Sequence, residues 1–316
     1  MAGSFSHAPV LITEALEYLA PFPNGIFVDG TLGGGGHAAE ILERSAPRGI
    51  LIGLDRDVDA LSAASERLAR YGDRVHTVHA SFRDLADVLE RIGYARVDGV
   101  LLDLGVSSPQ LDREERGFGF VHTDALLDMR MDRESGETAA DLLARLSSDE
   151  LARTFREYGD LRGARRLSTA IVDTRRESPL RTVGDLIAVI EAAGVGRGRK
   201  HNPATLVFQA LRIAVNDELG ALGEGLEAAI DALHPGRCVV VLAYHSLEDR
   251  IVKNHLRDAA RRCSCPPEIP VCVCGGVRRV ELLTRRPVSA TPEEVRSNPR
   301  ARSARLRAAR RFPEAV

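Results

Sequence analysis

Two aspartates and a run of glycines have the types and spacing of a nucleoside-binding site. Asp29 ends an apolar segment, four glycines follow at 33–36, and Asp55 ends the next apolar segment. Glycines let the backbone approach a ligand closely, and an acidic residue at the end of a second strand can accept both ribose hydroxyls of a nucleoside. A tight turn alone also explains such a run, so the loop by itself is a weak signal.

Asp29 distinguishes between two kinds of nucleoside ligand. A carboxylate just before the glycine loop would repel a pyrophosphate seated at the start of the following helix, which argues against NAD. The same carboxylate suits the ammonium group and the sulfonium of S-adenosylmethionine. We therefore expect S-adenosylmethionine as the ligand, with a purely turn-capping Asp29 as the alternative.

A third aspartate, Asp103, ends another apolar run in the segment LLDLGVSSPQ. Open α/β sheets bind ligands at the carboxyl ends of their strands, so we expect the transferred methyl group here, with Ser107, Ser108 and Pro109 near the acceptor. An aspartate that only caps a turn is the alternative. His245, at the end of a later strand, is a second candidate as proton acceptor or substrate contact, and a structural role explains it equally well.

The elements that position these residues follow an α/β pattern. Between 25 and 105, short apolar runs alternate with helical stretches, which predicts βαβ units and a parallel sheet. The run GVLLDLG is apolar throughout, as expected of a strand buried on both faces. We expect a Rossmann-like sheet with helices on both faces, interrupted by an inserted all-α domain, with the boundaries 1–113, 114–216 and 217–316.

The sheet pattern resumes in the last third of the chain. The apolar patterns there predict helices at 217–233 and 247–262 and strands at 237–244, near 277–285 and at 303–311. The stretch PEEVRSNPRARS before the last strand is rich in proline and arginine, and we expect it to form a loop.

Positive charge is concentrated in two segments, although the chain as a whole carries a net charge of −2. Residues 151–216 hold 12 Lys and Arg against 6 Asp and Glu, and residues 278–312 hold 11 against 3. Such segments predict a basic face for a polyanion, with solvated helix faces as the alternative. The candidate phosphate contacts are Arg162, Arg165, Arg166, Arg300, Arg302, Arg305 and Arg307.

The composition, 44% hydrophobic and 28% charged, is typical of soluble globular proteins. The N-terminus has no signal-peptide pattern, and we see no apolar run of about 20 residues that would cross a bilayer. We expect a cytoplasmic protein without a membrane segment. The sequence leaves the oligomeric state open, and a homodimer is one of the alternatives.

Four of the five cysteines are crowded between 263 and 274. Cys263, Cys265, Cys272 and Cys274 form two CxC pairs, which provide enough thiolates for a tetrahedral structural zinc site. Four reduced thiols in a loop are the alternative. Cys238 lies within a predicted strand, and we expect it to be a core residue.

Seven blocks of sequence together resemble a known family. DGTLGGGGH, GLDRD, LLDLGVSSPQLDREERGFGF, LDMRMD, FQALRIAVNDEL, YHSLEDRIVK and NPRARSARLR occur in the order found in the bacterial 16S rRNA cytosine-N4 methyltransferases, the RsmH (MraW) family. The resemblance runs from about His7 to Arg310. It implies a class I methyltransferase sheet and methylation of the exocyclic N4 of one cytidine in the decoding region of 16S rRNA, within the 30S subunit, with S-adenosylmethionine as donor.

The resemblance also implies a set of contacts to the methyl donor. By position in the matching motifs they are Gly35, Gly36, His37, Asp55, Phe82, Asp103 and Gln110. The family does not in general require the cysteine segment, which looks like a lineage-specific insertion. Two readings from other classes remain: an NAD-dependent oxidoreductase, and a non-catalytic RNA-binding ribosome assembly factor.

Overall fold

The computed structural model describes residues 9–107, 110, 113–195, 202–262, 265 and 276–313. The chain divides into two compact units, Met1–Gly105 with Leu219–Val316, and Val106–Glu218. Among the described residues no helix is long and apolar enough to cross a membrane.

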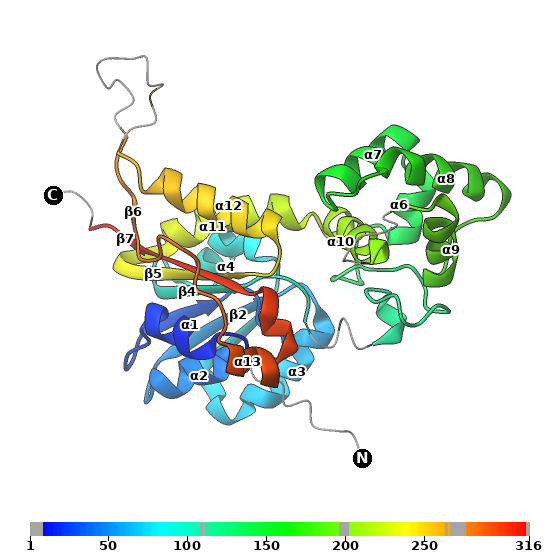
Figure 1. Ribbon diagram of the computed structural model, residues 1–316. Helices are drawn as coiled ribbons and strands as arrows, with labels where there is room; N and C mark the ends of the chain where they lie inside the picture. Colours follow the sequence, from blue (N-terminus) through cyan, green and yellow to red (C-terminus); the bar gives the residue numbers. More distant parts are fainter. Residues whose placement is uncertain are drawn as a thin grey trace. The chain divides into compact units, whose positions relative to one another are not determined.

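The first unit is built on a seven-stranded sheet in the order β3-β2-β1-β4-β5-β7-β6. The neighbours from β3 to β5 pair in parallel, and β7 is antiparallel to both β5 and β6. The predicted α/β fold with a parallel sheet is confirmed (Figure 1). The strands are β1 (Ile26–Asp29), β2 (Ile50–Asp55), β3 (Val75–His79), β4 (Val97–Asp103), β5 (Leu233–Ala243), β6 (Val280–Leu282) and β7 (Arg305–Arg311).

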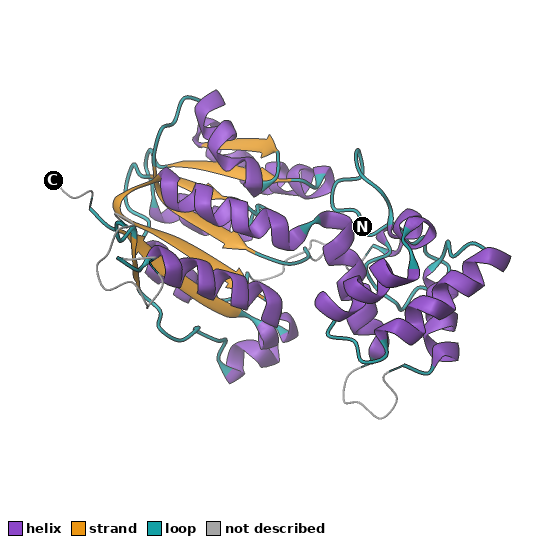
Figure 2. Ribbon diagram, turned by 90° about the horizontal axis from the view of Figure 1, so that it is seen from above, coloured by secondary structure: helices purple, strands orange, loops and turns teal. Residues whose placement is uncertain are grey.

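Helices cover both faces of this sheet, because its central strands bury side chains in both directions (Figures 1 and 2). Along β4, for example, Val100 and Leu102 belong to one core cluster and Leu101 to the other. One face packs against α4 (Leu85–Arg91), α11 (Glu218–Ala232) and α12 (Ser246–Ala259). The other packs against α1 (Ile12–Leu19), α2 (Gly36–Arg44) and α3 (Val58–Leu68).

The prediction of a loop for PEEVRSNPRARS is wrong. The stretch forms α13 (Pro292–Ser297) and the 3-10 helix η4 (Pro299–Ser303). The side chain of Thr291 accepts a hydrogen bond from the backbone N–H of Glu294, and the proline comes at the first helical position, where it is tolerated. Glu294 in turn accepts a hydrogen bond of 2.7 Å from the backbone N–H of Leu11. Other 3-10 helices are η1 (Ala69–Arg74), η2 (Phe82–Asp84) and η3 (Glu114–Arg116).

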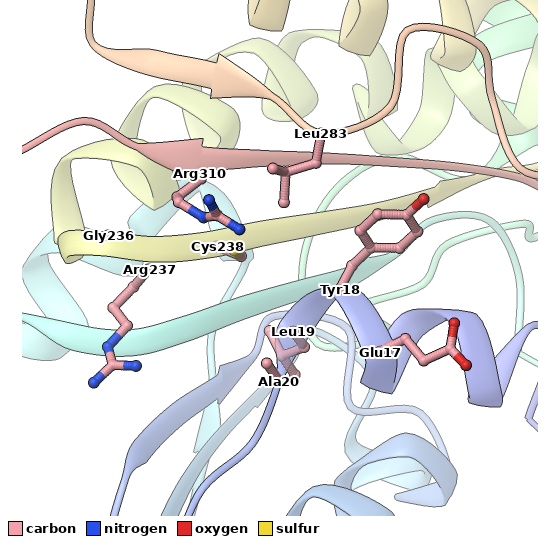
Figure 3. A pocket seen from close by; sticks show the side chains of 9 residues that line it. All are labelled: Glu17, Tyr18, Leu19, Ala20, Gly236, Arg237, Cys238, Leu283 and Arg310. Carbon is pink, nitrogen blue, oxygen red and sulfur yellow. The ribbon is translucent and has the colours of Figure 1, made fainter.

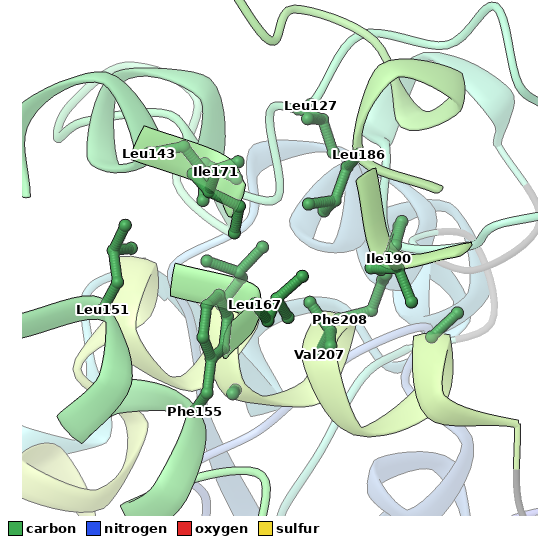
Figure 4. Close-up of a cluster of buried hydrophobic side chains, with 14 of the residues drawn as sticks. Leu127, Leu143, Leu151, Phe155, Leu167, Ile171, Leu186, Ile190, Val207 and Phe208 are labelled. Carbon is green, nitrogen blue, oxygen red and sulfur yellow. The ribbon is translucent and has the colours of Figure 1, made fainter. Parts of the chain in front are cut away.

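The described residues of the second unit form helices around one apolar core (Figure 4). Capping boxes at Thr138, Ser147 and Thr182 define where three of the helices begin. An isolated bridge joins Leu126 to Thr182. The helices are α6 (Ala139–Arg145), α7 (Ser148–Glu157), α8 (Ala164–Glu177), α9 (Val183–Ala193) and α10 (Pro203–Asn216).

Candidate active site

The strand order reverses between β1 and β4, and this is where open α/β sheets bind their ligands. Asp29, the last residue of β1, pairs with Gly53 on one side and Leu101 on the other. The neighbouring strands run two residues further and end at Asp55 and Asp103. Two carboxylates therefore flank the loop that leaves β1, and a third lies at its root.

The glycine loop between β1 and α2 depends on left-handed backbone conformations. Gly33 has φ of 50° and Gly35 has φ of 72°, which side chains of L-residues rarely adopt. Gly35 is the residue that precedes α2, so the turn brings the start of this helix to the carboxyl edge of the sheet.

Asp55 holds this loop in place. One of its carboxylate oxygens accepts a hydrogen bond of 2.8 Å from the backbone N–H of Gly33, and the other accepts one of 2.9 Å from that of Asp57. An ionised carboxylate offers about four lone-pair positions, so Asp55 can still accept hydrogen bonds from ribose hydroxyls.

Asp103 is fixed from three directions. Its backbone N–H donates to Oγ1 of Thr31 at 2.6 Å, which ties the end of β4 to the glycine loop. The hydroxyl of Tyr244 donates to Oδ1 of Asp103 at 2.7 Å. The second oxygen, Oδ2, lies 3.6 Å from Nδ1 of His37, the second residue of α2. Tyr244 immediately follows β5, so residues from four elements meet at this carboxylate.

The electrostatics of this edge favour a cationic ligand. Burial raises the pKa of Asp29 to about 7, with the neighbouring charges of Asp103 and Asp55 adding to the effect. Burial likewise raises the pKa of Asp55 to about 6. The pKa of Asp103 is also raised by burial, although His37 and the Tyr244 hydroxyl act in the opposite direction. A sulfonium or ammonium group placed here would stabilise the ionised carboxylates, so these residues fit S-adenosylmethionine.

Phe82 lies beside the same loop. It begins η2, directly after the segment that follows β3, and a Cβ added to Gly30 would lie 3.1 Å from the Cβ of Phe82. On the other side the ring rests on the backbone of α11, where a Cβ added to Gly225 would lie 2.3 Å from Cδ2 of Phe82. A half-buried aromatic ring in this place can cover the flat face of an adenine.

Other predicted site residues belong to the second unit or lie outside the described residues. The backbone N–H of Ser107 donates to Oε1 of the buried Gln110 at 2.9 Å, and both residues belong to the unit Val106–Glu218. Ser108 and Pro109 lie outside the described residues.

His245 caps α12 through Nδ1 of its ring. Its Nδ1 accepts a hydrogen bond of 3.4 Å from the backbone N–H of Glu248. Its Nε2 lies 3.1 Å from Oε1 of the same Glu248, but off the line of a hydrogen bond. Both ring nitrogens therefore face the first turn of α12, and a proton-accepting role for His245 stays a prediction.

Two of the candidate phosphate contacts serve the fold. Arg307 is buried, and its guanidinium donates to both carboxylate oxygens of Asp249 at 2.6 and 3.2 Å, so the prediction of a phosphate contact is wrong for this residue. Arg305 is more exposed and also donates to Asp249, at 3.1 Å. Arg165 pairs with Asp149 on the surface of the helical unit.

The predicted zinc ligands Cys263, Cys272 and Cys274 lie outside the described residues, and Cys265 is half-buried. The metal site therefore stays a prediction. Cys238 is buried within β5, as the sequence predicted for a core residue, and burial raises the pKa of its thiol.

A separate cavity of about 270 Å³ lies at the opposite, amino end of the parallel strands (Figure 3). Cys238 and Arg310 pair across β5 and β7 there, above the end of α1 in this view. The guanidinium of Arg237 is turned toward Asp98 and the ring of Phe22. This cavity shares no residue with the carboxylate edge, the edge of the sheet that carries Asp29, Asp55 and Asp103.

Reasoning from the sequence missed Tyr244 and Thr31. The signal for Tyr244 was present, because β5 pairs with β4 and Asp103 lies opposite Leu242, so a side chain just after β5 must lie close to Asp103. In the same motif, His245 alone was predicted as a site residue. Thr31 has no signal of its own, since its hydroxyl contact depends on how the loop folds.

Comparisons of the sequence with known proteins find relatives of high identity. The chain is 53% identical over 307 residues to "Ribosomal RNA small subunit methyltransferase H" of Symbiobacterium thermophilum, covering 96% of each protein. It is 54% identical over 312 residues to the protein of the same name from Pelobacter propionicus, covering 98% of this chain and 99% of that one.

Among solved structures, the chain is similar to a SAM-dependent O-methyltransferase from Thermotoga maritima, with a TM-score of 0.43 and 10% identity, over 98% of this chain and 69% of that one. The model of the MraW methylase family matches residues 4–312, nearly the whole chain. The protein belongs to the MraW methylase family.

Proposed function

We propose that this protein transfers the methyl group of S-adenosylmethionine to the exocyclic N4 of a cytidine in 16S rRNA. The observation that carries the proposal is the set of three carboxylates at the strand-order reversal, one buried and two half-buried, in a chain of the MraW methylase family. The name of the relatives, which specifies small-subunit ribosomal RNA, supports the choice of acceptor.

Each part of the methyl donor has a proposed partner. Asp29 faces the ammonium group, Asp55 accepts from the ribose hydroxyls, and the ring of Phe82 covers the adenine. Gly35 and Gly36 let the backbone approach the donor. His37 and Gln110 complete the proposed contacts.

The acceptor amine needs help from the protein. The lone pair of cytosine N4 is conjugated with the ring, which makes the amine a poor nucleophile. The protein therefore contributes by holding N4 in line with the methyl–sulfur bond and by placing an acceptor for the N4 protons, for which we propose Asp103. The cytidine must be unpaired or flipped out, because a stacked base pair hides N4.

The RNA itself would be held by the basic segments, and we propose the helical unit Val106–Glu218 as the recognition domain. Arg162, Arg300 and Arg302 remain candidate phosphate contacts. Affinity for 30S subunits should fall steeply with salt, and Arg162→Ala should flatten this salt dependence. A salt-independent affinity would contradict the electrostatic model.

The test of the proposal is methyl transfer from labelled S-adenosylmethionine to 30S subunits that lack the modification, followed by nucleoside analysis. N4-methylcytidine in the digest is the expected result. Another methylated nucleoside would overturn the choice of N4. Binding of S-adenosylmethionine without transfer would favour an assembly factor, and binding of NAD in its place would favour an oxidoreductase.

The cysteine segment is a separate proposal. If Cys263, Cys265, Cys272 and Cys274 bind structural zinc, the purified protein should contain about one zinc per chain by atomic absorption. Replacement of Cys265 by serine should lower this content, and zinc-free protein that is equally stable would contradict the proposal.

A further inference from the structure

The carboxylate of Asp103 is held between a tyrosine hydroxyl and a histidine ring. Oδ1 accepts the hydrogen bond of Tyr244 at 2.7 Å, so Oδ2 is the oxygen left for other partners. Oδ2 lies 3.6 Å from Nδ1 of His37, whose side chain is only 6% exposed. At this separation the two groups are neighbours that form no direct hydrogen bond.

The tautomer of His37 follows from its other neighbour. Nε2 lies 3.0 Å from the backbone carbonyl of Val10. A carbonyl oxygen can only accept, so Nε2 must carry the hydrogen. In neutral His37 the lone pair of Nδ1 therefore faces the carboxylate of Asp103. A proton placed between these two acceptors would be attracted by both of them.

Tyr244 is itself fixed in position. Its backbone N–H donates to Oε2 of the buried Glu248 at 2.8 Å, while its side chain reaches Asp103. A Cβ added to Gly105 would lie 3.1 Å from the ring, so the ring rests closely on the backbone beyond β4. Tyr244 therefore sets the direction in which the Asp103 carboxylate points.

We infer that Asp103 and His37 together accept the proton released by the methylated amine, and that Tyr244 is the positioning residue that aims the Asp103 carboxylate. This inference rests on the proposed function. It assigns to Tyr244, rather than to its neighbour His245, the role in the site.

The proton balance of the reaction requires such an acceptor. N4 forms a bond to the methyl carbon, the carbon–sulfur bond breaks, and sulfur keeps the electron pair as a neutral thioether. The methylated amine then carries an excess proton. This proton passes to Oδ2 of Asp103, beside the lone pair of Nδ1 of His37, while Tyr244 keeps its hydrogen bond to Oδ1.

Other charges around the pair determine its proton affinity. Asp29 and Glu248 are the other carboxylates whose charges act on this group or its neighbours, and Glu294 acts on Tyr244. Each of these negative charges raises the pKa of the group on which it acts. The Tyr244 hydrogen bond acts in the opposite direction, because it stabilises the ionised carboxylate.

The experiment compares Tyr244→Phe with wild type in single-turnover methyl transfer to 30S subunits over a range of pH. We expect the rate to fall about tenfold and the acidic limb of the profile to move to higher pH, since the ionised Asp103 loses a stabilising hydrogen bond. Affinity for S-adenosylmethionine should change little. Asp103→Asn, which cannot accept a proton, should lower the rate by roughly a hundredfold or more.

Tyr18→Phe is the matched control, because Tyr18 lines the cavity at the other end of the strands. It should keep the wild-type rate and profile. A wild-type rate and profile in Tyr244→Phe would overturn the positioning role, and near-normal turnover in Asp103→Asn would overturn the acceptor role. Loss of methyl transfer in wild type itself would instead overturn the proposed function.

A second readout does not depend on turnover. The nitrogen-15 spectrum of neutral His37 should show a hydrogen on Nε2 and none on Nδ1. A hydrogen on Nδ1 alone would contradict the proposed arrangement of His37 and Asp103.

Discussion

Replacement of Asp29 by asparagine should stabilise the free protein and weaken its binding of S-adenosylmethionine. Asp29 is 1% exposed, and its ordinary pKa of 3.8 is raised to about 7 in the fold. The unfolded chain therefore ionises Asp29 at a lower pH than the folded chain does. The contribution of Asp29 to folding stability is fully present below its pKa in the unfolded chain. It is lost as the pH rises toward its pKa in the folded chain.

The size of the effect follows from the shift. Each pKa unit corresponds to about 1.4 kcal/mol, so the shift of roughly three units costs the free protein about 4 kcal/mol once Asp29 is ionised. At about pH 5 only about 1.6 kcal/mol of this cost has accumulated. Asparagine does not ionise and can keep the hydrogen bond from the backbone N–H of Thr31. Its stability advantage over wild type should therefore grow by about 2–3 kcal/mol between about pH 5 and about pH 8.

Urea unfolding of both proteins at the two pH values measures this difference. Asp55 and Asp103 are present in both proteins, and the loss of their repulsion with ionised Asp29 adds to the advantage of the variant at the higher pH. Asp73→Asn, at an exposed position, is the control and should show no pH-dependent advantage. An advantage of Asp29→Asn that is equal at both pH values would refute the reasoning, because it would mean that Asp29 ionises alike in the folded and unfolded chains.

Three further outcomes follow from the same structure. Calorimetry near pH 6.5, repeated in buffers of different ionisation heat, should show release of protons when S-adenosylmethionine binds, and binding without proton release would argue against the carboxylate site. Gly225→Ala should weaken this binding about tenfold, because the new methyl group displaces the ring of Phe82, whereas Gly223→Ala on the same helix meets open space and should bind normally; equal affinities would contradict the role of the ring. Asp249→Ala should lower the free energy of unfolding by about 3–5 kcal/mol, because the buried Arg307 loses its partner, and a change below about 1 kcal/mol in urea titrations would show that the pair is dispensable.

The parallel sheet could be predicted because its strands are apolar throughout and alternate regularly with helices. The run that became β4 contributes side chains to both core clusters, which is why it shows no polar alternation in the sequence. The positions of Asp29, Asp55 and Asp103 followed from the same pattern, because parallel strands place their carboxyl ends at one edge.

The stretch after Thr291 could not be predicted in the same way. Its prolines and arginines are typical of loops, but the capping threonine and the Glu294 contact to Leu11, far away in the sequence, favour a helix. Arg307 was misassigned for a related reason. An arginine in a basic segment resembles a phosphate contact until the fold brings the carboxylate of Asp249 to it.

The site was predicted as a set of donor contacts, but its internal connections were not. The link between Tyr244 and Asp103 crosses from one strand to its neighbour and spans 141 positions in the chain. Local sequence pattern carries information about what each residue can do, and only the strand order determines which side chains meet.

The central claim is that this carboxylate edge delivers a methyl group to cytosine N4. The most direct test uses S-adenosylmethionine with a carbon-13 methyl group and 30S subunits whose cytidines carry nitrogen-15 at the exocyclic amine. After turnover, the nucleosides are released and examined by NMR. The account predicts a one-bond coupling between the transferred carbon and the labelled nitrogen. Carbon-13 on any other atom of the RNA, or none in the RNA, would contradict it.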